Sequence, residues 1–478
     1  MKRTLLFSAL LFTLATLISS CTPADNQVLT SYPSVYTESV SEAFPLAADG
    51  QCAEICLSDE DFAVVNITAD MLADDVERVT GKKPIVKKVS SLDELTTASV
   101  VAGTLGHSTI IDQLVSQQLI NVDEISGKWE ASVVKTLKHP TTGQPLFVVA
   151  GSDRRGTAFG LTSLSRAIGV SPWYWWADVV PSHKDALYIQ PGLYTQQEPS
   201  VQYRGIFIND ERFGGWAQWV ERHFDKETGK VGPKVYQKVF ELLLRLKGNY
   251  LWPAMHPGTQ AFNDDPENAR LANDYAIVMG SSHCEQMLRN NEGEWKAVNE
   301  HAKREGLVPP LGDFNYITNR KTMQDYWETR VKTNGQYENT YTLGLRGVHD
   351  YPMEGASTTE QRCVLMQQAI DDQRSLLKRN IDKPIEDIPQ ILCTYEEVLD
   401  AYHAGLKVPD DVIMLWSDDK QGYTRNLCNP DEMKRKGGAG IYYHLSYHGD
   451  PASWIWLSPL SPAFISIVIT VDSVSSSG

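Results

Sequence analysis

Short apolar runs alternate with amphipathic segments through the first half of the chain. Strands are predicted where β-branched and other apolar residues follow one another, at 62–67, 99–103 and 146–151. Helices are predicted after each of these strands, at 71–78, 110–119 and 156–168. This alternation predicts an α/β domain over residues 46–197 and leaves the type of sheet open.

The pattern becomes more regular from residue 198 onward. A helix is predicted at 235–247, closed by Gly248, and another is predicted to open with a capping box at Ser357 and Glu360 and to run to about 379. Around the helices lie seven apolar strands, predicted at 203–210, 249–255, 276–283, 340–350, 388–395, 412–419 and 440–447. Strands joined mainly by helices predict a (β/α) barrel over residues 198–462.

Polar residues follow the ends of these predicted strands. They are Asn209 and Asp210, His283 and Glu285, Arg346, His349 and Asp350, Glu396 and Glu397, Asp418 and Asp419, and Tyr447 and His448. Active sites of such barrels lie at the carboxyl ends of the strands. Carboxylates grouped beside an arginine and a histidine suit acid/base work on an anionic substrate. A turn or helix cap is the alternative for each single Asp or Asn. No third metal ligand at suitable spacing follows His283 and Glu285, so we expect no metal.

Composition narrows the class of protein. The chain has 478 residues, enough for two or three domains, and its 42% hydrophobic content is that of a globular protein. A formal charge of −16 argues against a nucleic-acid partner, because neutralising phosphates requires a basic surface.

The first 21 residues have the layout of an export signal. Lys2 and Arg3 precede an apolar run at 5–18, and small residues lead to Cys21. This layout resembles a bacterial lipoprotein signal, which implies cleavage before Cys21 and lipid on its thiol. An ordinary secretory peptide, the alternative, also predicts export. We expect a lipoprotein anchored in a bacterial envelope membrane only through that lipid, in the periplasm or at the cell surface, with a polar tether at 22–45.

Several long motifs resemble glycoside hydrolase family 115. They are GSDRRG at 151–156, SPWYWWAD at 171–178, YRGIFIND at 203–210, LRLKGNYLWPAM at 244–255, FNDDPEN at 262–268 and RGVHD at 346–350. The family consists of α-glucuronidases that remove glucuronic acid, or its 4-O-methyl ether, from glucuronoxylan. The resemblance implies an inverting mechanism without a cofactor. It also implies an α/β domain, a catalytic barrel, a helical domain and a C-terminal β-sandwich.

Position by position, the resemblance assigns roles to the residues at the strand ends. Glu397 is the expected general acid, and Glu396 is less favoured because adjacent strand residues face opposite sides. Asp350 and Asp210 are the alternatives for the base that activates water. The expected substrate-binding residues are Arg346 and His283, which would clamp the uronate, together with Asn209, Tyr447, His349 and Trp252.

The chain departs from the family at two places near the predicted pocket and at its end. His256 stands where the family usually has tryptophan, and Lys420 where it has asparagine. The match fades after Pro462, and residues 463–478 form an aberrant tail, so we expect a truncated chain and an incomplete barrel lacking its last strand. The β-branched tail could occupy that gap. Any homodimer would depend on the missing domains.

Three functions follow from these observations. The first is an α-glucuronidase acting on xylan-type polysaccharide or acidic xylo-oligosaccharides. The second is an inactive remnant, at most a carbohydrate-binding lipoprotein. The third is another exo-glycosidase on a similar barrel, for example one acting on hexosamines.

Overall fold

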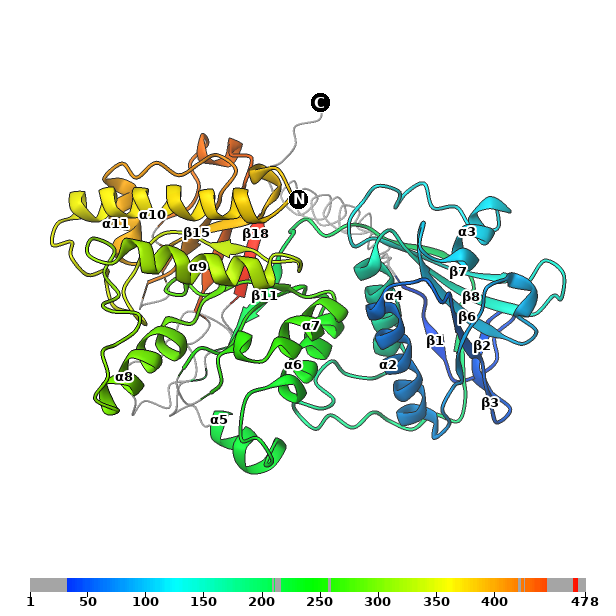
Figure 1. Cartoon of the computed structure of the whole chain (residues 1–478). Coiled ribbons are helices and arrows are strands. Elements are labelled where there is room, and N and C mark those ends of the chain that lie inside the picture. The colour runs from blue at the N-terminus through cyan, green and yellow to red at the C-terminus, as the bar shows by residue number, and fades with distance from the viewer. Residues whose placement is uncertain are drawn as a thin grey trace, which may run out of the picture.

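The computed structural model describes residues 32–208, 210, 216–256, 259–419, 423–424, 426–444 and 467–471. They form two lobes, a smaller one from the first part of the chain and a larger one from the rest (Figure 1). The predicted signal at 1–21, Asn209, Lys420 and Tyr447 lie outside the described residues. Within the described ranges, no helix has the length and apolar character needed to cross a membrane.

Two sheets build the smaller lobe. The four-stranded antiparallel sheet has the order β1-β9-β2-β3, from β1 (Val35–Tyr36), β2 (Phe44–Ala48), β3 (Gln51–Cys52) and β9 (Leu187–Ile189). The six-stranded sheet has the order β10-β7-β8-β6-β4-β5, from β4 (Glu54–Leu57), β5 (Val86–Lys88), β6 (Ser99–Thr104), β7 (Ser132–Lys138), β8 (Pro145–Gly151) and β10 (Leu193–Gln196). Strands β5, β4, β6 and β8 are parallel, whereas β7 and β10 are antiparallel to their neighbours, so this sheet is mixed.

Helices cover both faces of the six-stranded sheet. Helices α2 (Ala63–Thr80) and α4 (Arg154–Ala167) pack against one face, where Val100 and Phe147 point. Helix α3 (Thr109–Ser116) packs against the other face, with Val101 and Val148. Adjacent residues of β6 and β8 thus face opposite sides, as expected for strands buried on both faces.

Two predictions for this lobe are wrong. Residues 62–67, predicted as a strand, begin helix α2, because their buried valines continue at helical spacing into Ala69 and Leu72. The β-branched side chains that suggested a strand lower helix propensity only slightly. The predicted tether at 22–45 is also too long, since β1 and the first residues of β2 already pair with β9.

An eight-stranded sheet forms the centre of the larger lobe. Its order is β13-β12-β11-β18-β17-β16-β15-β14, from β11 (Arg204–Phe207), β12 (Tyr250–Trp252), β13 (Val278–Met279), β14 (Tyr341–Thr342), β15 (Gln390–Thr394), β16 (Ile413–Ser417), β17 (Ala439–Tyr443) and β18 (Ile467–Val471). All seven strands predicted from the sequence are present. Their directly paired members are parallel. A parallel bridge from Met279 to Asn339 joins β13 to the segment before β14 and closes the ring.

Strand β18 occupies the position in this ring for which the sequence predicted no strand. It comes from the predicted tail and is antiparallel to both β11 and β17. The sheet therefore does not lack its last strand, in contrast to the expectation from the sequence. The edges of β11 and β17 are paired on both sides, which removes the open edges that invite aggregation.

Seven helices belong to the larger lobe within the described residues. They are α5 (Trp216–Trp219), α6 (Pro233–Arg245), α7 (Pro266–Asp274), α8 (Ala297–Arg304), α9 (Arg320–Asn334), α10 (Thr359–Asn380) and α11 (Glu397–His403). Helix α10 opens with a capping box, but its members are Thr358 and Gln361, one residue later than predicted.

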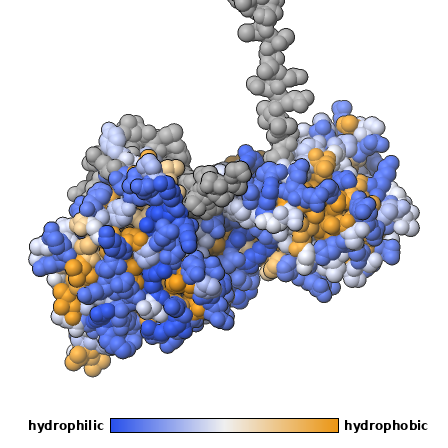
Figure 2. Space-filling model, turned by 90° about the horizontal axis from the view of Figure 1, so that it is seen from above, coloured by the Kyte–Doolittle hydropathy of each residue, from blue (hydrophilic) through white to orange (hydrophobic). Residues whose placement is uncertain are grey.

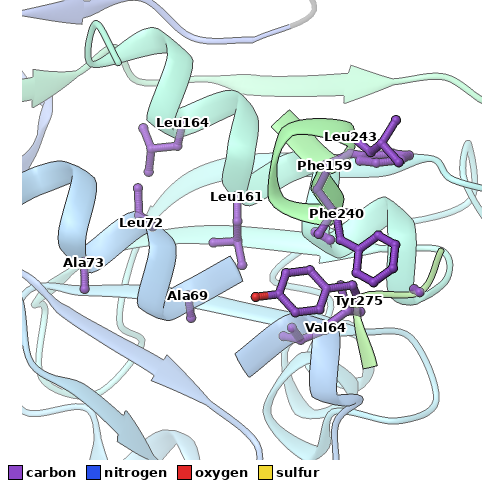
Figure 3. Close-up of a cluster of buried hydrophobic side chains, with 14 of the residues drawn as sticks. Val64, Ala69, Leu72, Ala73, Phe159, Leu161, Leu164, Phe240, Leu243 and Tyr275 are labelled. Atoms are coloured by element: carbon purple, nitrogen blue, oxygen red, sulfur yellow. The ribbon is translucent and has the colours of Figure 1, made fainter. Parts of the chain in front are cut away.

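The two lobes share a hydrophobic core. Val64 and Leu72 of α2, Phe159 and Leu161 of α4, and Phe240 of α6 belong to one buried cluster (Figure 3). At its side, the buried Arg245 of α6 donates two hydrogen bonds to Asp75 of α2, at 2.6 and 3.1 Å. Seen from above, the exposed face of the larger lobe is mainly hydrophilic (Figure 2). Apolar burial at the junction therefore holds the smaller lobe against the larger one.

Candidate active site

The guanidinium of Arg346 lies at the centre of the charged residues after β14 and β15. Its Nε and Nη2 donate to the two carboxylate oxygens of Glu397 at 2.9 and 3.0 Å, which is a bidentate pair. Its Nη1 donates to Asp350 Oδ1 at 2.5 Å. One buried cation thereby fixes two carboxyl groups from neighbouring parallel strands, the residues predicted as acid and base.

His283, which follows β13, completes this group. Its Nε2 lies 2.9 Å from Asp350 Oδ1, and its ring packs on Tyr395, with the ring centroids 4.4 Å apart. Burial lowers the pKa of His283, although the Asp350 carboxylate acts in the opposite direction. The Nδ1 atom has no hydrogen-bond partner. A neutral ring that donates from Nε2 to Asp350 leaves only a lone pair unsatisfied, so this tautomer fits the site.

Asp350 combines ionisation with access to solvent. Partial burial alone would raise its pKa, but the hydrogen bonds from His283 and Arg346 and the positive charge of Arg346 outweigh that effect and hold the pKa well below its usual range. Its side chain is 41% exposed, whereas that of Arg346 is fully buried. Asp350 is therefore a charged carboxylate that a water molecule can reach.

The two glutamates after β15 occupy different environments. Glu396 has a positive φ of 46° and connects β15 to α11 outside the strand, so strand alternation does not govern where the two side chains point. The Glu396 side chain is 39% exposed and that of Glu397 only 8%. Both reach Arg346, with Glu396 at 3.4 Å. The alternation argument against Glu396 is thus corrected, and Glu397 remains the glutamate bound bidentately.

Arg346 is occupied by protein carboxyl groups. Besides Glu397, Asp350 and Glu396, the backbone oxygen of Asp350 accepts a bond from Nη2 at 3.2 Å. In this arrangement Arg346 orients Glu397 and Asp350, the residues predicted as acid and base. A direct clamp on a substrate uronate, as predicted, requires one of these carboxyl groups to leave the guanidinium.

Asp210, the other predicted base, is enclosed by the loop after β12. Its carboxylate accepts hydrogen bonds from the backbone N–H groups of Met255 and His256 at 3.0 and 3.2 Å and from the Thr259 hydroxyl at 2.5 Å. It is buried. These bonds give Asp210 the geometry of a loop cap, and its role as a base stays a prediction.

Of the remaining predicted substrate contacts, the structure describes Trp252 and His349. Trp252 is fully buried within the sheet and its indole N–H donates to the Tyr250 hydroxyl, so its ring has no surface for a sugar. His349 has a positive φ of 59°, and its ring centroid lies 5.1 Å from that of His256, which follows β12. Asn209 and Tyr447 lie outside the described residues.

His283, Cys284 and Asp350 place ligand atoms within 4.8 Å of one another. They do not fit a metal ion. Burial raises the pKa of Cys284, which keeps it a thiol, and Asp350 already serves Arg346 and His283.

The family model for glycosyl hydrolase family 115 matches residues 196–470, more than half of the chain. The chain belongs to this family. Among solved structures it is similar to BtGH115A, a family GH115 4-O-methyl-α-glucuronidase described as having specificity for decorated arabinogalactans. The two share 39% sequence identity with a TM-score of 0.76, over 86% of this chain and 51% of that one. This family 115 chain therefore spans about half the length of that relative.

More distant structures are also similar. The Flavobacterium johnsoniae chitobiase has 11% identity and a TM-score of 0.45, over 84% of this chain and 55% of its own. The Vibrio harveyi exo-β-N-acetylglucosaminidase has 10% identity and a TM-score of 0.44, over 83% and 58%. Structural similarity with TM-scores below 0.5 and identities near 10% supports no inference about the function of this chain. A search of proteins with curated functions returned no match.

Sequence reasoning missed several residues of this family 115 site. Tyr395 and Tyr442 flank His283 with their rings, at 4.4 and 5.8 Å, and Tyr442 also packs on His444. His444 donates its backbone N–H to Asp418, and its Nδ1 lies 2.6 Å from the same carboxylate. Alternating positions within β15 and β17 were the available signal, but they do not distinguish the inside of a closed sheet from its outside.

Proposed function

We propose that this family 115 protein is an α-glucuronidase that removes glucuronic acid, or its 4-O-methyl ether, from xylan-type polysaccharides by inversion. The observation that carries the proposal is the placement of Asp350 and Glu397 on one buried guanidinium, at the carboxyl ends of two neighbouring parallel strands. We further propose that the closed eight-stranded sheet and its helices form the catalytic barrel, in which seven strands follow the (β/α) pattern and the antiparallel β18 takes the eighth position.

In this proposal Asp350 is the general base. A charged, solvent-reaching carboxylate can accept a proton from a water molecule as that water attacks the anomeric carbon of the uronosyl residue. Glu397 is the general acid that gives a proton to the leaving sugar oxygen. Because both of its oxygens accept N–H bonds from Arg346, donation requires Glu397 to release at least one of them.

The loops after β12 and β14 bring His256 and His349 together, with ring centroids 5.1 Å apart, and His349 directly precedes Asp350. We propose that these two partly buried rings line the place of the uronosyl group.

The specificity reported for BtGH115A makes arabinogalactan a second substrate to test. The chain lacking its predicted signal is incubated with glucuronoxylan, acidic xylo-oligosaccharides and decorated arabinogalactan, and released uronic acid is measured. Release from the xylan substrates supports the proposal. Binding of the polysaccharides without release indicates the carbohydrate-binding alternative, and neither binding nor release contradicts both.

The envelope location is a separate proposal. The layout before Cys21 supports export and lipid attachment there. Expression in a bacterium with radiolabelled palmitate tests it: the parent takes up label and Cys21→Ser does not. Equal labelling of both contradicts the assignment.

A further inference from the structure

Several aromatic rings meet beside helix α5, in the segment that joins β11 to α6. Trp219, the last residue of α5, stacks on Phe224 with ring centroids 5.7 Å apart and an interplanar angle of 10°. Trp175, from the segment between the lobes, meets the edge or face of both rings at nearly right angles, with centroids 6.0 and 5.1 Å away. We call Trp175, Trp219 and Phe224 the aromatic ledge.

The aromatic ledge holds its rings in place while leaving apolar surface open. Trp219 is 40% exposed, and Trp173, two residues before Trp175, is 37% exposed. The neighbouring Trp176 is anchored by its indole N–H, which donates to the backbone oxygen of Lys238 at 3.2 Å. The ledge thus combines one exposed indole, that of Trp219, with two partly buried rings that hold it in place.

The chain topology places the aromatic ledge on the active-site side of the sheet. Trp219 and Phe224 follow the carboxyl end of β11, just as Arg346 follows that of β14 and Glu397 that of β15. These strand ends share one side, because β11, β14 and β15 belong to one closed sheet whose helix-linked strands run parallel. Helix α5 lies at the lower edge of the molecule with α8, which also follows a strand end (Figure 1).

Exposed indole faces suit one class of ligand in particular. The C–H faces of pyranose rings are apolar and bear partial positive charge, so they pack on the negative face of an aromatic ring. A xylose or galactose backbone presents such faces repeatedly, whereas the uronosyl branch enters the charged pocket at Asp350 and Glu397.

We infer that the aromatic ledge is a subsite for the neutral backbone of the polysaccharide, outside the charged site at Asp350 and Glu397. The inference rests on the proposed α-glucuronidase function. The ledge would hold the polymer while a side chain is removed, so it would favour polymers over short oligosaccharides. A rigid aromatic side chain contributes contact area at little cost in conformational entropy.

Trp219→Ala tests the aromatic ledge, with Trp219→Phe as the conservative variant. Tyr36→Ala is the matched control, since Tyr36 is 38% exposed but lies on β1 of the other lobe. For Trp219→Ala we expect a fall of about tenfold in kcat/KM on polymeric glucuronoxylan, and less than a twofold change on acidic xylotriose, which has few backbone sugars beyond the branch point. Trp219→Phe should restore most of the loss, and Tyr36→Ala should match the parent.

Equal effects of Trp219→Ala on polymer and oligosaccharide, or no effect on either, would overturn the inference. So would a change in oligomeric state on gel filtration, which would assign the ledge to a protein interface. Electrophoresis through gels containing glucuronoxylan measures polysaccharide binding without catalysis. It therefore distinguishes failure of the ledge proposal from failure of the proposed function. If the parent releases no uronic acid but is retarded in the gel and Trp219→Ala is not, the ledge stands and the catalytic proposal fails.

Discussion

At the scale of single residues, the site is organised by one arginine that does not reach solvent. Arg346 neutralises charge that Asp350 and Glu397 would otherwise place close together, and its planar fork sets the direction of both carboxyl groups. A lysine cannot reproduce this fork. Arg346, which the sequence predicts as a substrate clamp, is in the folded chain bound to the two carboxyl groups that we propose as acid and base.

The adjacent glutamates provide a matched pair of variants. Glu397→Gln removes the proposed proton donor and keeps its shape, so we expect kcat on xylo-oligosaccharides to fall by about 10²–10⁴-fold. Glu396→Gln changes an exposed side chain at the mouth of the site and should stay within about tenfold of the parent. If Glu396→Gln shows the larger loss, the acid is Glu396 and the assignment is wrong.

Glu285 gives a prediction about stability. Burial raises the pKa of this carboxyl group well above its usual range, and its Oε1 has no hydrogen-bond partner. A carboxyl group whose pKa is raised by folding holds its proton more tightly in the folded than in the unfolded state, so it costs stability as the pH rises above about 4.3, where the unfolded group ionises. Glu285→Gln, which resembles the neutral acid, should raise the free energy of unfolding at pH 7 by about 1 kcal/mol or more.

Urea unfolding at two pH values checks this prediction. The gain from Glu285→Gln should be present at pH 7 and should shrink toward pH 4, where the unfolded carboxyl group also holds its proton. A variant that is less stable than the parent by the same amount at both pH values would show that the carboxyl group itself is needed.

Placing chemistry at strand ends was sufficient to find Arg346, Asp350, Glu397 and His283 from the sequence. It could not distinguish Glu396 from Glu397, because the positive φ of Glu396 arises in the turn into α11. Nor could it show that Trp252 is buried. In a closed sheet both faces of a strand are apolar, and alternation then carries little information.

At the scale of elements, helices α2 and α6 are joined by charge as well as by apolar packing. Asp75 accepts two hydrogen bonds from Arg245 in the shared core, whereas Asp74, its neighbour in sequence, pairs with Lys83 on the surface. Asp75→Asn leaves a buried arginine partly unpaired and should lower the free energy of unfolding by about 3–5 kcal/mol. Asp74→Asn should lower it by less than about 1 kcal/mol.

Chemical denaturation of both variants compares these two pairs directly. Similar small losses for Asp74→Asn and Asp75→Asn would contradict a stabilising role for the buried pair at the junction of the lobes.

Strand β18 can be tested by interrupting its pairing. Ile469 lies opposite Arg204 of β11 and Ile441 of β17, so a proline there removes a hydrogen-bond donor from a strand that is paired on both sides. We expect Ile469→Pro to cost about 3 kcal/mol and to speed amide exchange in β11 and β17. Strands β4, β6 and β8 of the other lobe serve as the internal control. Unchanged exchange in β11 and β17 would show that β18 does not close the sheet.

Three long elements were predictable from different signals: α6 from its hydrophobic periodicity, α10 from its capping box and β8 from its continuous apolar run. Helix α2 was predicted only over 71–78, because its first turns are rich in β-branched residues, whose local preference tertiary packing overrides. The sequence suggested the tail as one possible occupant of the gap but could not establish this position for β18. The pairing of β18 with β11 joins segments more than 250 residues apart, and β18 runs antiparallel in an otherwise parallel arrangement.

At the scale of the whole molecule, the chain combines a mixed α/β lobe with a closed sheet that carries the family 115 site. The shared core around α2, α4 and α6 fixes the smaller lobe against the outer helices of the larger one. The charged residues around Arg346 and the aromatic ledge both follow the carboxyl ends of strands of the closed sheet. Our proposal therefore predicts an enzyme that binds an acidic branch at these charged residues while the neutral backbone stays outside.

The anomer of the first released product tests the central claim most directly. Acidic xylo-oligosaccharide is incubated with the protein, and the ¹H NMR spectrum of the uronic acid is followed before mutarotation. Because water attacks from the face opposite the leaving group, the account predicts that β-glucuronic acid, or its 4-O-methyl ether, appears first and the α-anomer later. Initial release of the α-anomer, or no release of uronic acid, would contradict it.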